Sequence, residues 1–329
     1  MKKIVKFIKE EYVTIIIVIL ILFFGLYRLP YNLYVGGGTI SLANRLEVEN
    51  AYQEAGSFNL TYVKSIRSTI PTYLLSYLLN WERQSIEDEK LDENDSMSDM
   101  WEREKLYLQE ANDNAIISAY KLAGESINIK KELLKILYVD KDSQTDLKIG
   151  DTILSIAGVP LKEFEEIKNI LDKYNIGDRL NVTYLRDNKE YNGYFIIREM
   201  DGMKKAGLYL IKLFDYDINR KVEFKFKSSE GGPSGGLMTS LAIYNRLVKE
   251  DITKGRKIVG TGTIDSNGNI GEIGGVKYKL AGAVSGKADV FLVPEGNYEE
   301  AYQEMKDKNY QINLVMVKTL QEAVDYLKR

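Results

Sequence analysis

The sequence contains no histidine and no cysteine in its 329 residues. These two absences exclude Ser-His-Asp and Cys-His catalytic sites, HExxH zinc sites and Cys/His metal clusters. The lack of cysteine also excludes disulfide bonds, although it leaves the compartment open. A nucleophilic serine in this chain therefore needs a different base. A lysine whose pKa is lowered by burial is the usual substitute, and we expect no metal or other cofactor.

The chain also lacks an excess of charge of either sign. It has 45 Lys and Arg residues against 48 Asp and Glu, a formal net charge of −3. This balance creates no field that would gather nucleic acid, so we expect no nucleic-acid partner. Residues 282–287 are faintly similar to a phosphate loop, but a Walker sequence requires glycine at 281 and Ser or Thr at 288, where this chain has alanine. We therefore expect no use of ATP.

The first 34 residues predict a membrane anchor. Lysines at positions 2, 3, 6 and 9 fall in a segment, 1–11, that precedes an almost wholly apolar run from 12 to 27. With residues 28–34 as interfacial flank, a helix over 12–34 is long enough to cross ~30 Å of hydrocarbon at ~1.5 Å per residue. The lysines place the N-terminus in the cytoplasm, so everything after about residue 36 is expected outside the cell membrane. A cleaved secretory signal is the alternative, but no small-x-small site follows the run.

A glycine-rich turn at residues 228–236 carries the candidate nucleophile. Residues 222–227 alternate apolar and charged side chains, which predicts a strand, and helical spacing begins at Leu237. The turn therefore joins a strand to a helix. Pro233 suits a first helical turn, so Ser234 is expected at the helix N-terminus, among free amides and the positive end of the dipole.

Lys277 is the candidate base. Positions 277, 280, 281 and 284 fall on one helical stripe, so Lys277 is expected to face apolar packing, whereas Lys279 lies off that stripe and is expected in solvent. Ser234 shares an equivalent inward stripe with residues 237, 238 and 241. A lysine held among apolar side chains has a lowered pKa, which suits a general base.

Taken together, these residues resemble the Lon-type serine peptidases, which use a Ser-Lys dyad. The sequence G-P-S-G-G at 232–236 matches the turn of the family's serine, and I-G-G-V-K at 273–277 matches the step before its lysine, 43 residues from Ser234. The match continues through T-G-T-I at 261–264, V-F-L-V-P at 290–294 with Asn297 after it, and L-Q-E-A-V at 320–324. It covers about residues 205–329.

This resemblance implies a proteolytic domain at 205–329 and hydrolysis of exported peptides or membrane-proximal proteins through an acyl-enzyme. Backbone amides of the 231–236 turn are expected to bind the oxyanion, and Gly232 and Ser234 are the better donors because Pro233 has no N–H. Thr261 is expected to hold the lysine amine, although an ordinary β-branched strand residue is an equal alternative. The family also forms rings, which makes a homo-oligomer an expectation. Residues 36–125 are expected to complete this domain, because the family domain begins with similar strands.

Residues 126–200 resemble a PDZ domain. The segment 146–161 follows the pattern L-x-x-G-D-x-I, and a helix near 164–174 and a strand at 177–187 are expected after it. PDZ domains bind an extended peptide C-terminus as an added strand. Because residues 130–136 lack the glycine-containing carboxylate loop, peptide capture and a plain scaffold or gating role remain equal alternatives.

The sequence as a whole predicts an α+β (mixed α/β) fold with a transmembrane helix, a PDZ-like domain and a Lon-type proteolytic domain. The predicted function is a membrane-anchored, ATP-independent serine endopeptidase. A catalytically silent scaffold that binds peptides or membrane proteins is the main alternative. A second alternative is an anion-binding nest at residues 231–236 that cradles a phosphate.

Overall fold

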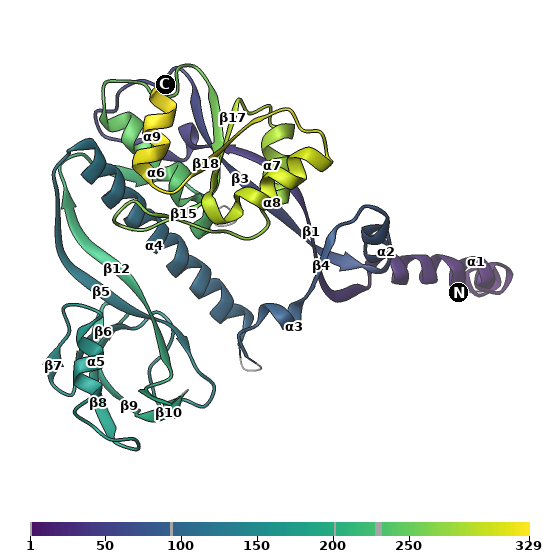
Figure 1. The fold of residues 1–329 in the computed structure, drawn as a ribbon. Coiled ribbons are helices and arrows are strands. Elements are labelled where there is room, and N and C mark those ends of the chain that lie inside the picture. The colour runs from purple at the N-terminus through teal and green to yellow at the C-terminus, as the bar shows by residue number, and fades with distance from the viewer. Residues whose placement is uncertain (1, 93–94, 201, 228–231) are drawn as a thin grey trace. The chain divides into compact units, whose positions relative to one another are not determined.

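The computed structural model describes residues 2–92, 95–200, 202–227 and 232–329 (Figure 1). The chain divides into two compact units, one formed by residues up to 37 and 63–91, the other by 38–62 and 92–329. Strands β1 (Arg28–Ser41) and β3 (Ser57–Thr69) run from one unit into the other. The mixture of helices and strands in both units confirms the α+β class.

The first unit contains the N-terminal helix and a short antiparallel pair. Besides the parts of β1 and β3 that belong to it, this unit contains α1 (Lys2–Leu26), α2 (Ile70–Leu78), β4 (Glu82–Ser85) and α3 (Ile86–Glu89). β4 pairs antiparallel with residues 31–34 of β1. The predicted helix over 12–34 therefore ends early, at Leu26, because residues 28–34 pair as a strand and Pro30 cannot continue a helix interior. Among the described residues, no helix has the length and apolar character needed to cross a bilayer.

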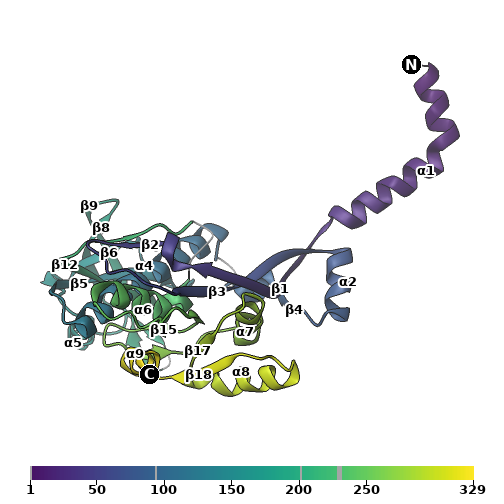
Figure 2. The same cartoon turned by 90° about the horizontal axis from the view of Figure 1, so that it is seen from above.

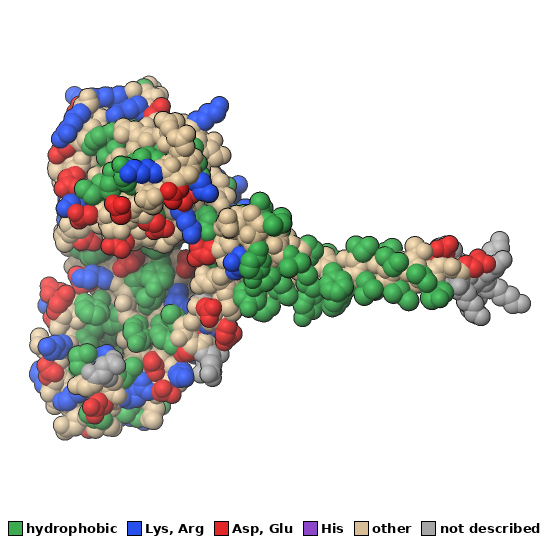
Figure 3. Space-filling model, turned by 45° about the vertical axis from the view of Figure 1, so that its right-hand side comes forward, with side chains coloured by type: hydrophobic (Ala, Val, Ile, Leu, Met, Phe, Trp, Pro, Cys, Tyr) green, Lys and Arg blue, Asp and Glu red, His purple; other side chains and the backbone are tan. Residues whose placement is uncertain are grey.

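Apolar side chains cover the surface of α1 and α2. From Tyr12 to Tyr27 the large apolar side chains of α1 and the residue after it are between 48% and 72% exposed, apart from the half-buried Ile15, and Leu78 of α2 is 81% exposed. Figure 3 shows these side chains as a green surface that follows both helices. Residues 70–79 include no charged side chain. Water is a poor solvent for such a surface, which is therefore a candidate contact surface.

A parallel sheet forms the centre of the second unit. It is built from the first residues of β3, followed by β14 (Lys257–Gly260), β17 (Val290–Pro294) and β18 (Asn313–Val317), each parallel to its neighbour. All five residues of β17 are buried. A strand covered on both faces is expected to be a continuous apolar run, which is what 290–294 is.

Helices cover both faces of this sheet. One face is covered by α7 (Val276–Ser285) and α8 (Glu295–Asp307), which Figure 2 shows. Val259, Phe291 and Val293 point to the face that packs on α7 and α8. Residues that alternate with them, such as Ile258 and Leu292, point to the opposite face. That face packs on α4 (Met97–Ala123), α6 (Gly236–Leu247) and α9 (Leu320–Lys328).

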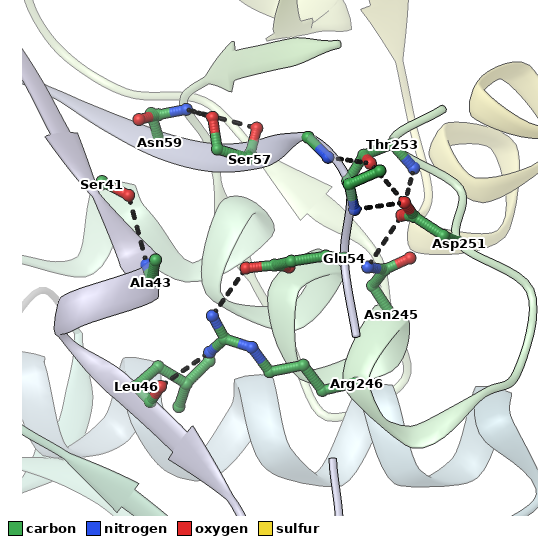
Figure 4. Close-up of polar contacts among 12 residues, drawn as sticks. Ser41, Ala43, Leu46, Glu54, Ser57, Asn59, Asn245, Arg246, Asp251 and Thr253 are labelled. Atoms are coloured by element: carbon green, nitrogen blue, oxygen red, sulfur yellow. Dashed lines mark hydrogen bonds and ion pairs between the residues drawn. The ribbon is translucent and has the colours of Figure 1, made fainter. Parts of the chain in front are cut away.

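Polar contacts attach residues 41–59 to the end of α6 and the loop after it (Figure 4). The guanidinium group of Arg246 donates to the carbonyl of Leu46 at 2.7 Å and to Glu54 at 2.9 Å. Asp251 accepts a hydrogen bond from the amide of Ala55 at 2.7 Å, and Thr253 accepts one from the next amide at 2.9 Å. Together with the pairing of β3 and β14, these contacts make residues 38–62 part of the same compact unit as residues 232–329.

Short elements complete this part of the chain. They are η1 (Leu42–Asn44), β2 (Leu46–Val48), β13 (Val222–Phe224), η2 (Pro233–Gly235), β15 (Thr263–Ile264) and β16 (Ile270–Gly271). β13 pairs with β2, and β15 pairs with β16. The strand predicted over 222–227 is therefore shorter than expected and ends at Phe224.

A second sheet, with its own core, lies between α4 and β13 in the sequence. Its order is β12-β5-β6-β8-β9, and β7 pairs with β6. The elements of this region are β5 (Ile127–Val139), β6 (Thr152–Ile156), β7 (Val159–Pro160), α5 (Glu166–Leu171), β8 (Arg179–Arg186), β9 (Lys189–Ile196), β10 (Arg198–Met200), β11 (Met203–Lys205) and β12 (Leu208–Ile218). β12 pairs with β5 along its whole length. The sheet therefore extends beyond residue 200, where the sequence places its end.

This pairing also changes where an added strand could bind. Around Leu134 and Lys135, β5 has β6 on one side and β12 on the other. An extended peptide therefore cannot add to β5 there. Within the described strands, β12 and β9 are the two outermost strands of this sheet.

The helix α4 connects the two sheets. It begins at Met97, because Ser96 and Asp99 form a capping box at its start. Buried Asp113 accepts hydrogen bonds from the amide of Phe214 at 3.2 Å and from the hydroxyl of Tyr216 at 3.3 Å. Near its other end, α4 packs on α6, where the hydroxyls of Ser118 and Ser240 are 3.2 Å apart. One helix thus contacts both β12 and the helix that follows Ser234.

Candidate active site

Ser234 lies in the short helical turn η2, just before α6. Its side chain is half-buried, whereas Leu237, Met238 and Leu241 on the next turns are fully buried. Pro233 occupies the first position of the turn, where its missing N–H leaves no bond unmade. The expected position of Ser234, at the entrance to a buried helix, agrees with this geometry. Residues 228–231 of the predicted turn lie outside the described residues.

The backbone on either side of Ser234 is attached to residues 261–262, which follow β14. The amide of Gly262 donates to the carbonyl of Ser234 at 2.9 Å, and the amide of Leu237 donates to the carbonyl of Gly262 at 3.1 Å. Thr261 adds a third contact, because its hydroxyl donates to the same Ser234 carbonyl at 3.1 Å. The position of the serine is therefore set by the end of a central strand. Carboxyl ends of parallel strands are where α/β sheets bind ligands.

Lys279 is the buried lysine of this site. Its side chain is 6% exposed, and its Nζ donates to the hydroxyl of Thr261 at 3.2 Å. Burial lowers the pKa of the Lys279 ammonium from 10.5 to about 8. Thr261, which is itself 1% exposed, thus links the lysine amine to the backbone of Ser234.

Lys277 lies on a different face of α7. It is half-buried, and its Nζ is 5.0 Å from the ring centroid of Tyr278. The expectation that Lys277 faces the apolar core and Lys279 faces solvent is therefore wrong. The buried stripe of α7 is formed by Val276, Lys279, Leu280 and Ala283, one position away from the stripe that the sequence favoured.

One sequence signal identifies the correct stripe. Val276, Leu280 and Ala283 have the i, i+4, i+7 spacing of a core-facing stripe, and Lys279 is the only polar residue within it. A lysine in such a position breaks the apolar pattern. The expectation for Lys277 rests on a stripe whose other members are apolar, and such a stripe does not reveal a lysine that replaces an apolar residue in the core.

Gly232 begins the turn with a backbone conformation that favours glycine. Its φ is +139°, and a Cβ there would meet no atom within 4 Å, so the requirement for glycine is conformational rather than steric. The amide of Gly235 donates to the carbonyl of Gly232 at 3.4 Å, and the amide of Gly236 donates to Pro233. The assignment of the Gly232 and Ser234 amides as oxyanion donors stays a prediction.

The described residues include no group of three or more acidic side chains that could hold a metal ion. The chemistry that the site can support rests on a hydroxyl, an amine of lowered pKa and backbone amides. These are the components of nucleophilic catalysis by a serine with a lysine base.

Comparison with known proteins matches this region to one protein family. Residues 227–328, which include Ser234, Thr261 and Lys279, match the family model of the Lon protease (S16) C-terminal proteolytic domain. This part of the chain is thus similar to a Lon-type proteolytic domain.

Three curated relatives align with parts of the chain. A Lon protease of Helicobacter pylori is 25% identical over 185 residues, which is 54% of this chain and 22% of that protein. A Lon protease of Neorickettsia sennetsu is 29% identical over 99 residues, 30% of this chain and 12% of that protein. The peroxisomal Lon protease homolog 2 of Kluyveromyces lactis is 35% identical over 101 residues, 30% of this chain and 10% of that protein. The chain spans less than a quarter of the length of these relatives.

Solved structures are similar to about a quarter of this chain. The PDZ domain of an SdrC-like protein from Listeria monocytogenes is 20% identical with a TM-score of 0.22, covering 24% of this chain and 86% of that one. The corresponding domain from Listeria innocua is 22% identical with a TM-score of 0.23, covering 24% of this chain and 92% of that one.

Proposed function

We propose that this protein is a serine endopeptidase that uses Ser234 as nucleophile and Lys279, in place of Lys277, as general base. The observation that carries this proposal is the bond from the buried Lys279 amine to Thr261, whose hydroxyl in turn contacts the Ser234 backbone. The match of residues 227–328 to a Lon-type proteolytic domain supports the reaction class.

The first step is formation of an acyl-enzyme. Neutral Lys279 takes the proton of the Ser234 hydroxyl while the oxygen attacks the peptide carbonyl carbon. The amine donates one N–H to Thr261, which orients the ammonium or amine and leaves the lone pair of the neutral form for the serine proton. The amides of Gly232 and Ser234 are proposed to stabilise the oxyanion.

Collapse of the tetrahedral intermediate breaks the C–N bond, and the Lys279 ammonium returns its proton to the leaving amine. A water molecule then attacks the ester, with Lys279 again accepting a proton, and releases the second product and free Ser234. No step requires a nucleotide, and the sequence has no Walker motif, so we propose that cleavage is independent of ATP.

We also propose that the chain is anchored in the cell membrane through α1, with the N-terminus in the cytoplasm and the catalytic part outside. The support is the exposed apolar surface of α1 and α2 and the lysines at the start of the sequence. Substrates would then be exported peptides or membrane-proximal proteins. A test is protease protection of the full-length chain in cells: cleavage of the catalytic part from outside supports the topology, and full protection contradicts it.

The peptidase proposal is tested with the full-length chain in detergent, without ATP, and an unstructured polypeptide as substrate. Fragments are followed by mass spectrometry. We expect wild type and Lys277→Met to cleave, and Ser234→Ala and Lys279→Met to be inactive. The two lysine variants are a matched pair, because they remove the same group two residues apart on one helix. Lack of cleavage by wild type would favour the alternative of a silent scaffold.

A further inference from the structure

Asn297 forms two hydrogen bonds with a single residue of the loop before α7. It is the third residue of α8 and is 6% exposed. Its Oδ1 accepts the amide of Ile273 at 2.8 Å, and its Nδ2 donates to the carbonyl of Ile273 at 2.9 Å. One side-chain amide thus satisfies both backbone polar groups of Ile273, as a neighbouring strand would.

This contact lies at the entrance to the helix that carries Lys279. Ile273 is followed by two glycines, and Gly275 caps α7 with a left-handed φ of +68° and no side-chain cap bond. A pair of glycines restrains the chain only weakly. The amide of Lys279 donates to the carbonyl of Gly275 at 3.3 Å, so the lysine lies within a helical turn of this flexible entrance. The two hydrogen bonds of Asn297 therefore restrain the chain at the residue that directly precedes this pair of glycines.

The end of β17, just before α8, also holds Thr261, whose hydroxyl accepts the hydrogen bond from Lys279. The amide of Thr261 donates to the carbonyl of Leu292 at 3.0 Å, and Leu292 belongs to β17, which leads directly into α8 and Asn297. The two sides of the Lys279–Thr261 bond are therefore both attached to the β17–α8 connection. A change of less than 1 Å in the α7 entrance would open this 3.2 Å bond.

We propose that Asn297 is a positioning residue that fixes the entrance of α7 so that the Lys279 amine meets Thr261. This inference rests on the proposed role of Lys279 as the base. Among the described residues, the side chain of Asn297 forms its hydrogen bonds with Ile273 and not with Ser234, so it acts through the backbone of Ile273. Its effect is therefore expected on the environment of the lysine and on turnover rather than on substrate binding.

A second buried asparagine provides a matched control. Asn245, which is 1% exposed, also uses both ends of its amide. Its Oδ1 accepts the amide of Ile252 at 2.9 Å, and its Nδ2 donates to Asp251 at 3.2 Å, the second of which Figure 4 shows. It lies near the far end of α6, about 16 Å along the helix from Ser234 at ~1.5 Å per residue. Loss of Asn245 should destabilise the fold without moving Lys279.

The experiment compares the full-length wild type with Asn297→Ala and Asn245→Ala. An amine-reactive acetylating reagent is applied over pH 6–11 without substrate, and modification of the Lys279 peptide is measured by mass spectrometry. For wild type we expect slow modification with a midpoint near pH 8. For Asn297→Ala we expect at least tenfold faster modification at high pH and a midpoint at least one pH unit higher, because water reaches the amine. Asn245→Ala should retain the wild-type profile.

Cleavage kinetics provide the second measurement. Asn297→Ala should lower kcat by about 10- to 100-fold with KM within about threefold of wild type. If Asn297→Ala does not fold, Asn297→Ser, which loses at least one of the two bonds, should shift the labelling midpoint in the same direction. An Asn297 variant whose labelling profile matches that of Asn245→Ala would overturn the inference. If wild type does not cleave, the proposed function fails, but the labelling profile still decides the role of Asn297.

Discussion

The two helices that carry the site, α6 and α7, are buried in different ways. Every residue of α6 from 236 to 247 is buried. Any stripe chosen along α6 is therefore a buried one. α7 has a single buried stripe, and Lys279 lies in it. A pattern of apolar residues therefore located the buried helix after Ser234 and failed to locate the buried lysine of α7. The comparison teaches that a buried lysine is found as an interruption of an apolar stripe, not as a neighbour of one.

The largest expected effect separates the two lysines of α7. Lys279→Met should lower kcat/KM by about 1,000-fold or more, as loss of a dyad member does in serine hydrolases, whereas Lys277→Met should stay within about threefold of wild type. Initial rates of peptide cleavage at pH 8 measure both. Equal losses in the two variants would remove the distinction between the two faces of α7.

A smaller effect is expected at the link between the two helices. Thr261→Val removes the acceptor for the Lys279 amine and the donor to the Ser234 carbonyl, and should lower kcat by about 10- to 100-fold. Thr261→Ser retains the hydroxyl and should recover most of the activity. If Thr261→Val is as active as Thr261→Ser, the bond between the lysine and the threonine has no role in turnover.

The buried lysine should also reduce stability at neutral pH. Its pKa is about 8 in the folded protein against 10.5 in the reference state, so below pH 8 both states hold the proton and the full cost of burial is present. Between pH 8 and 10.5 the unfolded state binds more protons, so this cost decreases as pH rises.

Lys279→Met should therefore stabilise the fold at pH 7, by about 3 kcal/mol at most, with a gain that decreases toward pH 10.5. Thermal unfolding of full-length wild type and Lys279→Met over pH 6–10 measures this difference. Lys277→Met is the control and should show no such pH-dependent gain. A gain of equal size in Lys277→Met would contradict the assignment of the buried stripe.

The smallest effect is expected where α4 meets β12. Burial raises the pKa of Asp113 to about 6, against 3.8 in the reference state, so the folded state binds more protons between these values and stability decreases as pH rises through that window. Asp113→Asn should flatten this part of the stability profile by about 1–2 kcal/mol, measured by denaturant unfolding at pH 4 and 7. An unchanged slope would show that Asp113 is solvated in the folded state.

Some of this architecture could be predicted from sequence. The helix after Ser234, the buried run at 290–294 and the α+β class follow from local patterns of apolar residues and from turn residues. The pairing of β5 with β12 could not be predicted, because residues 127 and 218 are brought together by the whole intervening domain. The start of α4 at Met97 is hard to predict because its first half is polar and acidic, and its capping box is a weaker signal than an apolar stripe.

One further feature depends on contacts that no local pattern records. The proposed role of Asn297 depends on its two bonds to Ile273, 24 residues away in the chain. That pairing is visible only in the tertiary structure.

The pH dependence of peptide cleavage tests the central claim most directly, because it reports the pKa of the base in the free enzyme. We predict that kcat/KM of the full-length wild type rises with a midpoint near pH 8, that Lys277→Met has the same midpoint, and that Lys279→Met is inactive throughout. A midpoint near 10.5, or loss of activity in Lys277→Met with activity retained in Lys279→Met, would contradict the assignment of Lys279 as the base.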